Sequence, residues 1–177
     1  ALNIGCLYQN PLRGTAPNLT IEENLALAYT RKASPSFFAL NKKDSAYFRE
    51  VLSTLGMGLE DRMKTKIGLL SGGQRQAASL LMATIAEPEL LLLDEHTAAL
   101  DPGAAEKVMA LTKKIVEENK ITTLMITHDM EYALEYGSRT IMLDSGKIVM
   151  DLTGKEREEM TTGKLAELFY GKAHKRG

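Results

Sequence analysis

LLLLDEHTAALDP, residues 90–102, is an apolar run that ends abruptly in two acids, Asp94 and Glu95. Four consecutive leucines predict a strand that is buried on both faces, as strands of parallel sheets are. In open parallel sheets, ligands bind beyond the carboxyl ends of the strands. The two carboxylates are therefore candidates for a binding site, although capping of the turn that follows would explain them equally well.

The composition indicates one domain and argues against some classes of partner. The chain has 177 residues, of which 44% are hydrophobic, enough to bury a sizeable core. Its formal net charge of −1 provides no bulk attraction to nucleic acid or to an anionic membrane. No apolar run approaches the roughly 20 residues that span a bilayer. With Cys6 as the single cysteine, we expect a cytosolic domain that binds no nucleic acid.

Strand and helix patterns alternate after residue 70, which predicts an α/β fold with a mostly parallel sheet covered by helices. We expect residues 1–11 and 87–177 to form this core, and residues 12–86 to form an inserted helical subdomain. Further elements follow from apolar periodicity, from the capping-box spacing of Thr20 and Glu23, and from turn signals such as DSGK, residues 144–147. We predict strands at 2–8, 90–93, 122–127, 139–144 and 147–152, and helices at 21–29, 44–56, 71–86 and 103–118.

Three predicted strands end in polar residues that parallel pairing would gather at one edge of the sheet. Gln9 follows the first, Asp94 and Glu95 the second, and His128 the third. Two carboxylates, an amide and an imidazole suit phosphoryl transfer with a bound Mg²⁺ and a water nucleophile. In that interpretation Asp94 holds the metal through its waters, Glu95 polarises the attacking water, and His128 bonds the terminal phosphate.

The segment LSGGQRQ, residues 70–76, predicts a helix that begins with two glycines. Ser71 and Gln74 have the spacing of a capping box, which makes Ser71 the N-cap. Gly72 and Gly73 disfavour the first turn by about 1 kcal/mol each. Bare backbone N–H groups at a helix N-terminus form an anion site, which would explain the glycines. A plain glycine-containing turn into a helix is the other interpretation.

Taken together, LSGGQRQ, LLLLDE, AALD and THD, with a glutamine ending an earlier strand, resemble the ATP-binding-cassette (ABC) ATPases in order and spacing. The resemblance covers nearly the whole chain and implies ATP and Mg²⁺ as cofactors. It makes Ser71, Gly72, Gly73 and Gln74 the signature motif. It also makes Gln9 the Q-loop glutamine and a magnesium ligand with Asp94, Glu95 the catalytic glutamate, Asp101 the D-loop aspartate and His128 the switch histidine.

The resemblance also implies partners and a location. In this family the signature motif closes over ATP held by a second subunit, so we expect a head-to-tail dimer with a second copy of the chain. In transporters, a membrane permease inserts a short helix near the Q-loop. We expect a bacterial importer with such a permease, and an extracytoplasmic substrate-binding protein as a further candidate partner. The chain would lie in the cytoplasm, peripheral on the inner face of the membrane through the permease.

The chain departs from the family pattern in two ways. His96 stands where the family usually has proline; it either tunes the neighbouring glutamate or is a tolerated loop substitution. No G-x-x-x-x-G-K-[ST] phosphate loop occurs in residues 1–177. In the family that loop precedes the Q-loop, so we expect these residues to be part of a longer chain. We also expect the missing strand to neighbour those ending at Gln9 and Asp94, leaving Leu90–Leu93 without covering neighbours.

Two other functions remain open at this stage. A soluble ABC mechanoenzyme that acts on DNA or ribosomes would carry long coiled coils or tandem cassettes. Only 61 residues separate Gln9 from Ser71, with no sustained heptads, which favours the transporter. A degenerate chain that does not hydrolyse ATP would lack its catalytic residues, whereas Glu95 and His128 are present.

Overall fold

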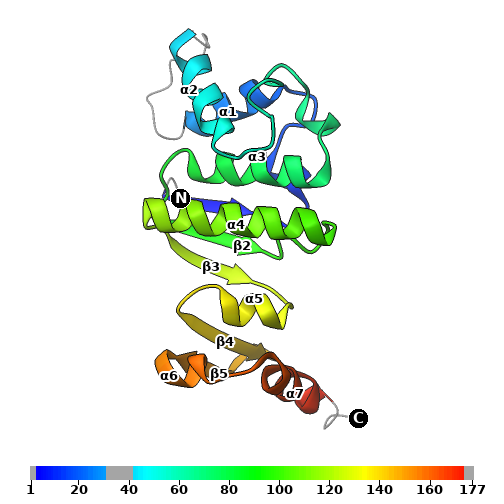
Figure 1. The fold of residues 1–177 in the computed structure, drawn as a ribbon, viewed down its shortest axis with the longest axis vertical. Helices are drawn as coiled ribbons and strands as arrows, with labels where there is room; N and C mark the ends of the chain where they lie inside the picture. The colour runs from blue at the N-terminus through cyan, green and yellow to red at the C-terminus, as the bar shows by residue number, and fades with distance from the viewer. Residues whose placement is uncertain (1–2, 31–41, 174–177) are drawn as a thin grey trace. The chain divides into compact units, whose positions relative to one another are not determined.

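β2, Leu90–Asp94, is the middle strand of a three-stranded parallel sheet, with β1, Ile4–Leu7, on one side and β3, Thr122–Ile126, on the other (Figure 1). The computed structural model describes residues 3–30 and 42–173 of the chain. The pairing confirms the predicted α/β class with a parallel sheet.

The chain divides into two units, Ala1–Ile126 and Thr127–Gly177. The first unit contains, besides its sheet, η1 (Pro11–Gly14), α1 (Ile21–Tyr29), α2 (Lys42–Ser53), η2 (Ile67–Leu69), α3 (Gly72–Thr84) and α4 (Pro102–Asn119). The second contains α5 (Met130–Glu135), β4 (Arg139–Asp144), β5 (Lys147–Thr153), α6 (Gly154–Glu158) and α7 (Thr162–Ala173). The proposed subdivision into core and helical subdomain stays a prediction.

The sheet of the first unit buries one face more completely than the other. Leu91 and Leu93 are fully buried against apolar side chains of α3 and α4. Leu90 and Leu92 point to the opposite face and are only half-buried. The prediction that the leucine run is buried on both faces is therefore wrong in the described part of the chain, because the described helices pack tightly against one face only.

β2 is paired on both sides, in the registers Leu7 with Leu93 and Leu93 with Met125. The prediction that a missing strand adjoins the one ending at Asp94 and leaves it without neighbours is therefore wrong, whereas a missing strand beside the one ending at Gln9 stays a prediction. Within the described residues, the unpaired edges of this sheet belong to β1 and β3.

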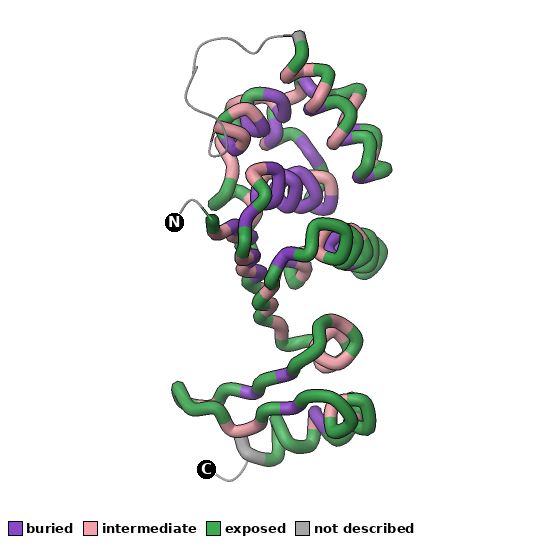
Figure 2. Tube along the Cα trace, turned by 90° about the vertical axis from the view of Figure 1, so that its left-hand side faces the viewer, coloured by how far each residue is buried: buried purple, intermediate pink, exposed green. Residues whose placement is uncertain are grey.

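The helical segment of the first unit has its own apolar core. α1 begins at the predicted capping box, in which Thr20 and Glu23 bond each other's backbone N–H groups at 3.2 and 2.7 Å. α2 is shifted from the predicted 44–56 to Lys42–Ser53. α3 is buried over most of its length (Figure 2). The core is formed by Ile21, Leu25, Phe48, Leu52, Leu55, Leu59, Ile67, Ala77, Leu81 and their neighbours.

The second unit is built on a β-hairpin with helices around it. β4 and β5 pair antiparallel, and the turn between them has Ser145 and Gly146 at φ +51° and +76°. Two successive positive φ values are the geometry that a two-residue hairpin turn requires. The predicted DSGK turn is thus confirmed. Of the helices in the described ranges, none is long and apolar enough to cross a membrane.

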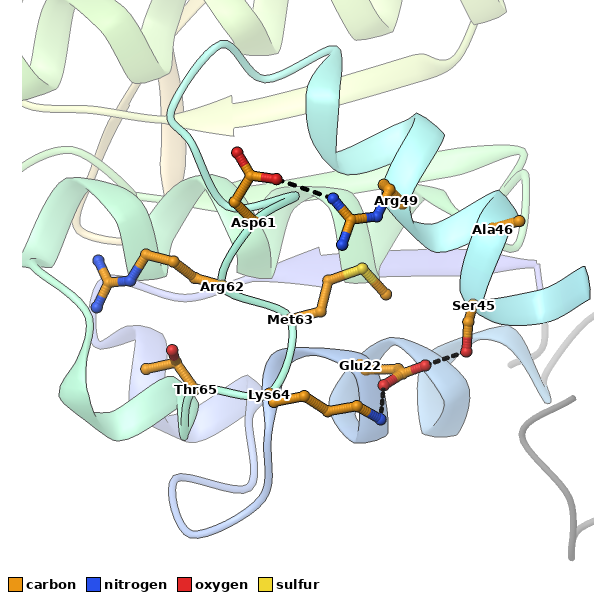
Figure 3. A pocket seen from close by; sticks show the side chains of 9 residues that line it. All are labelled: Glu22, Ser45, Ala46, Arg49, Asp61, Arg62, Met63, Lys64 and Thr65. Atoms are coloured by element: carbon orange, nitrogen blue, oxygen red, sulfur yellow. Dashed lines mark hydrogen bonds and ion pairs between the residues drawn. The ribbon is translucent and has the colours of Figure 1, made fainter. Parts of the chain in front are cut away.

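A buried carboxylate joins α1 to the loop that precedes α3. Glu22 is 1% exposed, accepts a hydrogen bond from the Ser45 hydroxyl and forms an ion pair with Lys64 (Figure 3). These residues line a pocket of about 570 Å³ that also holds the exposed Arg49–Asp61 ion pair. Burial raises the pKa of Glu22, but the hydrogen bonds from Lys64 and Ser45 lower it more, so the pKa lies below its ordinary value of 4.5.

We expect Glu22→Gln to reduce the free energy of unfolding at pH about 7 by about 1–3 kcal/mol, because a buried charged hydrogen-bond acceptor is lost. Since the folded-state pKa is lowered, the stabilisation is present above pH 4.5 and is lost as the pH falls through the folded-state value. The free energies of unfolding of wild type and variant should therefore converge as the pH falls, and urea unfolding of both proteins at several pH values measures this.

Asp61→Asn is the control for this prediction, because it removes an acid from the same pocket whose ion pair with Arg49 is exposed. We expect it to change the free energy of unfolding by less than about 1 kcal/mol. A difference between wild type and Glu22→Gln that stays constant down to low pH would contradict the role of the Glu22 charge.

Candidate functional site

The register of β1 and β2 brings Gln9 and Glu95 together. Leu7 is paired with Leu93, and Gln9 and Glu95 each follow their paired residue by two positions. The two side chains therefore leave the carboxyl edge of the sheet at the same level. Gln9 Nε2 donates to Glu95 Oε2 at 3.4 Å. The structure thus joins the amide and one carboxylate that the sequence predicts to act together.

Asp94 is the last residue of β2 and lies opposite Ile126 of β3. Its side chain is exposed, next in sequence to the Gln9–Glu95 contact. Gln9, Asp94 and Glu95 therefore offer oxygen atoms at one edge of one sheet. This is the part of the predicted magnesium site that the first unit assembles.

The backbone of Glu95 is held in an unusual conformation. Its φ of +45° lies in the left-handed region, which a residue with a Cβ avoids by about 1–2 kcal/mol. The Glu95 N–H donates to the Ile126 carbonyl at 3.0 Å, and the Glu95 carbonyl accepts from the Ala98 N–H at 3.0 Å. Such strain persists only where surrounding contacts hold it, and it occurs often at functional sites.

His96 is buried, although it lies in the turn after β2. It is 2% exposed, and its Nε2 lies 3.3 Å from Oγ1 of Thr112 on α4. Burial lowers the pKa of His96 to about 4, so the ring is neutral at pH 7. A side chain with this burial and this partner is part of the packing between the turn and α4.

The predicted capping box of LSGGQRQ is confirmed. Ser71 Oγ accepts from the Gln74 N–H at 3.3 Å, and Gln74 Oε1 accepts from the Ser71 N–H at 3.4 Å. Arg62 also donates to Gln74 Oε1, at 3.3 Å. Ser71 and Gly72 are exposed, so the start of α3 is accessible.

The two glycines of the motif have different surroundings. A Cβ on Gly72 would meet only the tip of Leu100, Cδ2, at 3.2 Å. Gly73 is buried, and a Cβ there would lie 3.0 Å from the Cβ of Ala104 on α4. Close packing of α3 against α4 therefore explains Gly73 without any ligand, whereas exposed Gly72 remains a candidate for close approach to a phosphate.

Gln76 is a residue of the site that the sequence did not single out. It is 1% exposed, and its Nε2 donates to the Tyr8 carbonyl at 3.2 Å. This bond ties α3 to the end of β1, just before Gln9. The two partners are 68 positions apart in the sequence, so no local pattern reveals the contact.

Asp101 and His128 are exposed and lie at helix starts. Asp101 is the N-cap of α4 and accepts from the Ala104 N–H at 3.0 Å. His128 belongs to the second unit and precedes α5, whose N-cap is Asp129. The structure therefore brings Gln9, Asp94 and Glu95 together in the first unit and describes His128 within the second unit alone.

The described residues contain no group of three or more His, Cys, Asp or Glu side chains that could hold a metal. Proteins usually hold Mg²⁺ through one or two side-chain oxygens, with waters and substrate phosphates completing the octahedron. Asp94 and Gln9 are donors of that kind. At a site of this type, waters and the phosphates of a bound substrate would supply the remaining ligands.

The family model for ABC transporters matches residues 1–98. A tyrosine transport ATP-binding protein of Clostridioides difficile is 42% identical over 163 residues, which cover 92% of this chain and 65% of that protein. The chain belongs to the ABC transporter family. A phosphonates import ATP-binding protein of Oceanobacillus iheyensis is 35% identical over 152 residues, 84% of this chain and 58% of that protein.

Solved structures of other ABC proteins share the fold. An inward-facing putative metal-chelate type ABC transporter superposes with a TM-score of 0.74 at 25% identity, covering 95% of this chain and 64% of that one. A dimeric ATP-binding cassette in a post-hydrolysis state, bound to ADP and phosphate, superposes with a TM-score of 0.71 at 30% identity. The match covers 85% of this chain and 62% of that one. The chain thus spans less than two thirds of the length of these relatives.

We expect Gly73→Ala to destabilise the protein by about 1–3 kcal/mol, because the added methyl group would push α3 away from Ala104. Gly72→Ala is the matched control. Its methyl group meets only the movable end of Leu100, so the free energy of unfolding should change by less than about 1 kcal/mol. Urea unfolding of the two variants measures the difference. Equal effects would show that packing against Ala104 does not explain the second glycine.

Proposed function

We propose that this chain is the ATP-hydrolysing part of an ABC importer subunit, with ATP and Mg²⁺ as cofactors. The observation that carries the proposal is the Gln9–Glu95 contact beside Asp94 at the carboxyl edge of the sheet. Membership of the ABC family supports the nucleotide, and a structural neighbour is bound to ADP and phosphate.

Each residue at the sheet edge has a proposed role. Asp94 and Gln9 would hold Mg²⁺ and its waters, and Glu95 would accept a hydrogen bond from the attacking water and orient it. His128 would bond the terminal phosphate. When bound, Mg²⁺ would neutralise negative charge on the phosphates. The hydrogen bond from Gln9 to Glu95 supports this assignment, because it restricts the carboxylate that must aim the water.

A head-to-tail dimer would complete the site. Ser71, Gly72, Gly73 and Gln74 would present the start of α3 to ATP held by the second subunit, with Asp101 nearby. The exposure of Ser71 and Gly72 supports this arrangement. A helix N-terminus offers N–H groups and a partial positive charge to a phosphate. A structural neighbour was solved as a dimer, which supports the same assembly.

The proposed permease would dock in a groove of about 620 Å³ between the end of β1, η1, α1 and α3. Tyr8 and Leu27 line it and are about two-fifths exposed. An apolar groove of this kind suits a short amphipathic helix. The chain would then lie on the cytoplasmic face of the membrane through its permease.

The direction and substrate of transport are proposed from relatives. One is named for tyrosine transport and another for phosphonate import, which supports an importer of a small polar solute such as an amino acid. In importers of this family the permease and an extracytoplasmic binding protein select the solute. Purification of the complete protein from a membrane fraction tests this part, and a co-purifying permease is the expected result. Association with ribosomes or DNA in place of a permease would contradict it.

We expect Glu95→Gln in the complete protein to reduce ATP turnover by about 10² or more while ATP still binds, because the water loses its orienting carboxylate. The variant should accumulate as an ATP-bound dimer. Glu89→Gln, the same change at the opposite end of β2, is the control and should leave turnover unchanged. Steady-state ATPase assays and size-exclusion chromatography with ATP measure both effects. Near-normal turnover of Glu95→Gln would assign catalysis elsewhere.

Gly72→Leu tests the dimer. We expect the bulky side chain to keep α3 away from the partner's phosphate, so that ATP-driven dimerisation fails while the monomer still binds nucleotide. Gly163→Leu is the control, since Gly163 also lies near a helix start and faces open space. Light scattering with ATP and a fluorescent-nucleotide titration separate the two properties. Loss of nucleotide binding by the monomer would contradict the placement of the motif in trans.

A further inference from the structure

We propose that His96 is a positioning residue, whose hydrogen bond to Thr112 holds the backbone of Glu95 in the conformation that ATP hydrolysis requires. The inference rests on the role of Glu95 proposed above. It assigns the His96–Thr112 pair a function in turnover in addition to its packing.

The direction of the hydrogen bond follows from the other partner of Thr112. The Thr112 hydroxyl donates its hydrogen to the Val108 carbonyl at 2.8 Å. Its oxygen is therefore the acceptor for His96, and the ring carries its proton on Nε2, 3.3 Å away. His96 and Thr112 are 2% and 5% exposed, so water competes little for the bond.

The turn that contains Glu95 is held from two sides. On the sheet side, the Glu95 N–H donates to Ile126 of β3 at 3.0 Å. On the helix side, the next residue, His96, is attached to α4 through Thr112. A left-handed residue other than glycine persists only where its surroundings over-determine it. Because His96 follows Glu95 directly, release of its ring would remove one restraint on the peptide between them, whose carbonyl also accepts from the Ala98 N–H at 3.0 Å.

His96 acts through Glu95 and does not contact the reaction itself. The Glu95 side chain reaches Gln9, whereas the His96 ring reaches α4 and is buried there. A displacement of about 1 Å in an orienting group can reduce a rate by up to about 10². Loss of the His96–Thr112 hydrogen bond would therefore lower turnover by displacing the Glu95 carboxylate.

Proline, which the family usually has at this position, would restrict the backbone by its own ring and would need no partner on α4. Histidine does not fix its own φ, so at this position the hydrogen bond to Thr112 restricts the backbone instead. Turnover should therefore depend on the Thr112 hydroxyl when residue 96 is histidine and not when it is proline.

Two matched pairs of variants in the complete protein test the inference. Thr112→Val removes the acceptor and Thr112→Ser keeps it; His96→Leu removes the donor and His96→Gln keeps an N–H of similar reach. We expect Thr112→Val and His96→Leu to lower kcat by about ten-fold with KM for ATP nearly unchanged. Thr112→Ser and His96→Gln should stay near wild type. In the His96→Pro background, Thr112→Val should have no further effect on kcat.

The outcomes distinguish positioning from stability alone. If Thr112→Val and His96→Leu keep the wild-type kcat while their Tm falls, or if Thr112→Val slows His96→Pro equally, the inference is overturned. If Thr112→Val fails to fold, the His96→Leu and His96→Gln comparison decides. Turnover that survives Glu95→Gln would remove both the proposed role of Glu95 and this inference. Turnover that is lost in Glu95→Gln but normal in Thr112→Val and His96→Leu would remove the inference alone.

Discussion

The register between β1 and β2 is the constraint on which the candidate site depends. Leu7 lies beside Leu93, and both side chains are buried in the same apolar cluster. A slip of one residue would turn the buried leucines of β2 to the more open face and expose them, so the core enforces the register. Gln9 and Glu95 inherit their proximity from it, since each follows its paired leucine by two positions. The packing of the buried leucines thus determines where the polar side chains of Gln9 and Glu95 lie.

A second set of contacts connects the two motifs of the first unit. α3 follows its exposed N-cap, Ser71, and packs through Gly73 against Ala104 at the start of α4. It is also bonded to the end of β1, where Gln76 donates to the Tyr8 carbonyl. The start of α3 and the segment before Gln9 therefore belong to one packed body. A buried hydrogen bond and a close helix–helix contact connect the two places.

The sequence predicted well those features that depend on local chemistry. Both capping boxes, the hairpin turn and the leucine strand follow from spacing over a few residues, and the structure has them. It failed where the answer depends on which elements become neighbours. The half-buried state of Leu90 and Leu92 and the pairing of β2 on both sides could not be read from the run itself, because burial is a property of the covering elements. His96 is the clearest case, since its partner Thr112 lies 16 positions away on another element.

The adjacent glycines of LSGGQRQ show why a motif can carry structural and functional information at once. Both glycines disfavour the helix start. From the sequence alone, close approach of a phosphate would explain the two glycines equally. The structure separates them: Gly73 is buried where a methyl group would strike Ala104, whereas Gly72 faces outward near the movable tip of Leu100. Packing alone would retain Gly73 in a protein that binds nothing. The case for an anion site at this helix start therefore depends on Gly72, whose cost to the helix no neighbouring backbone explains.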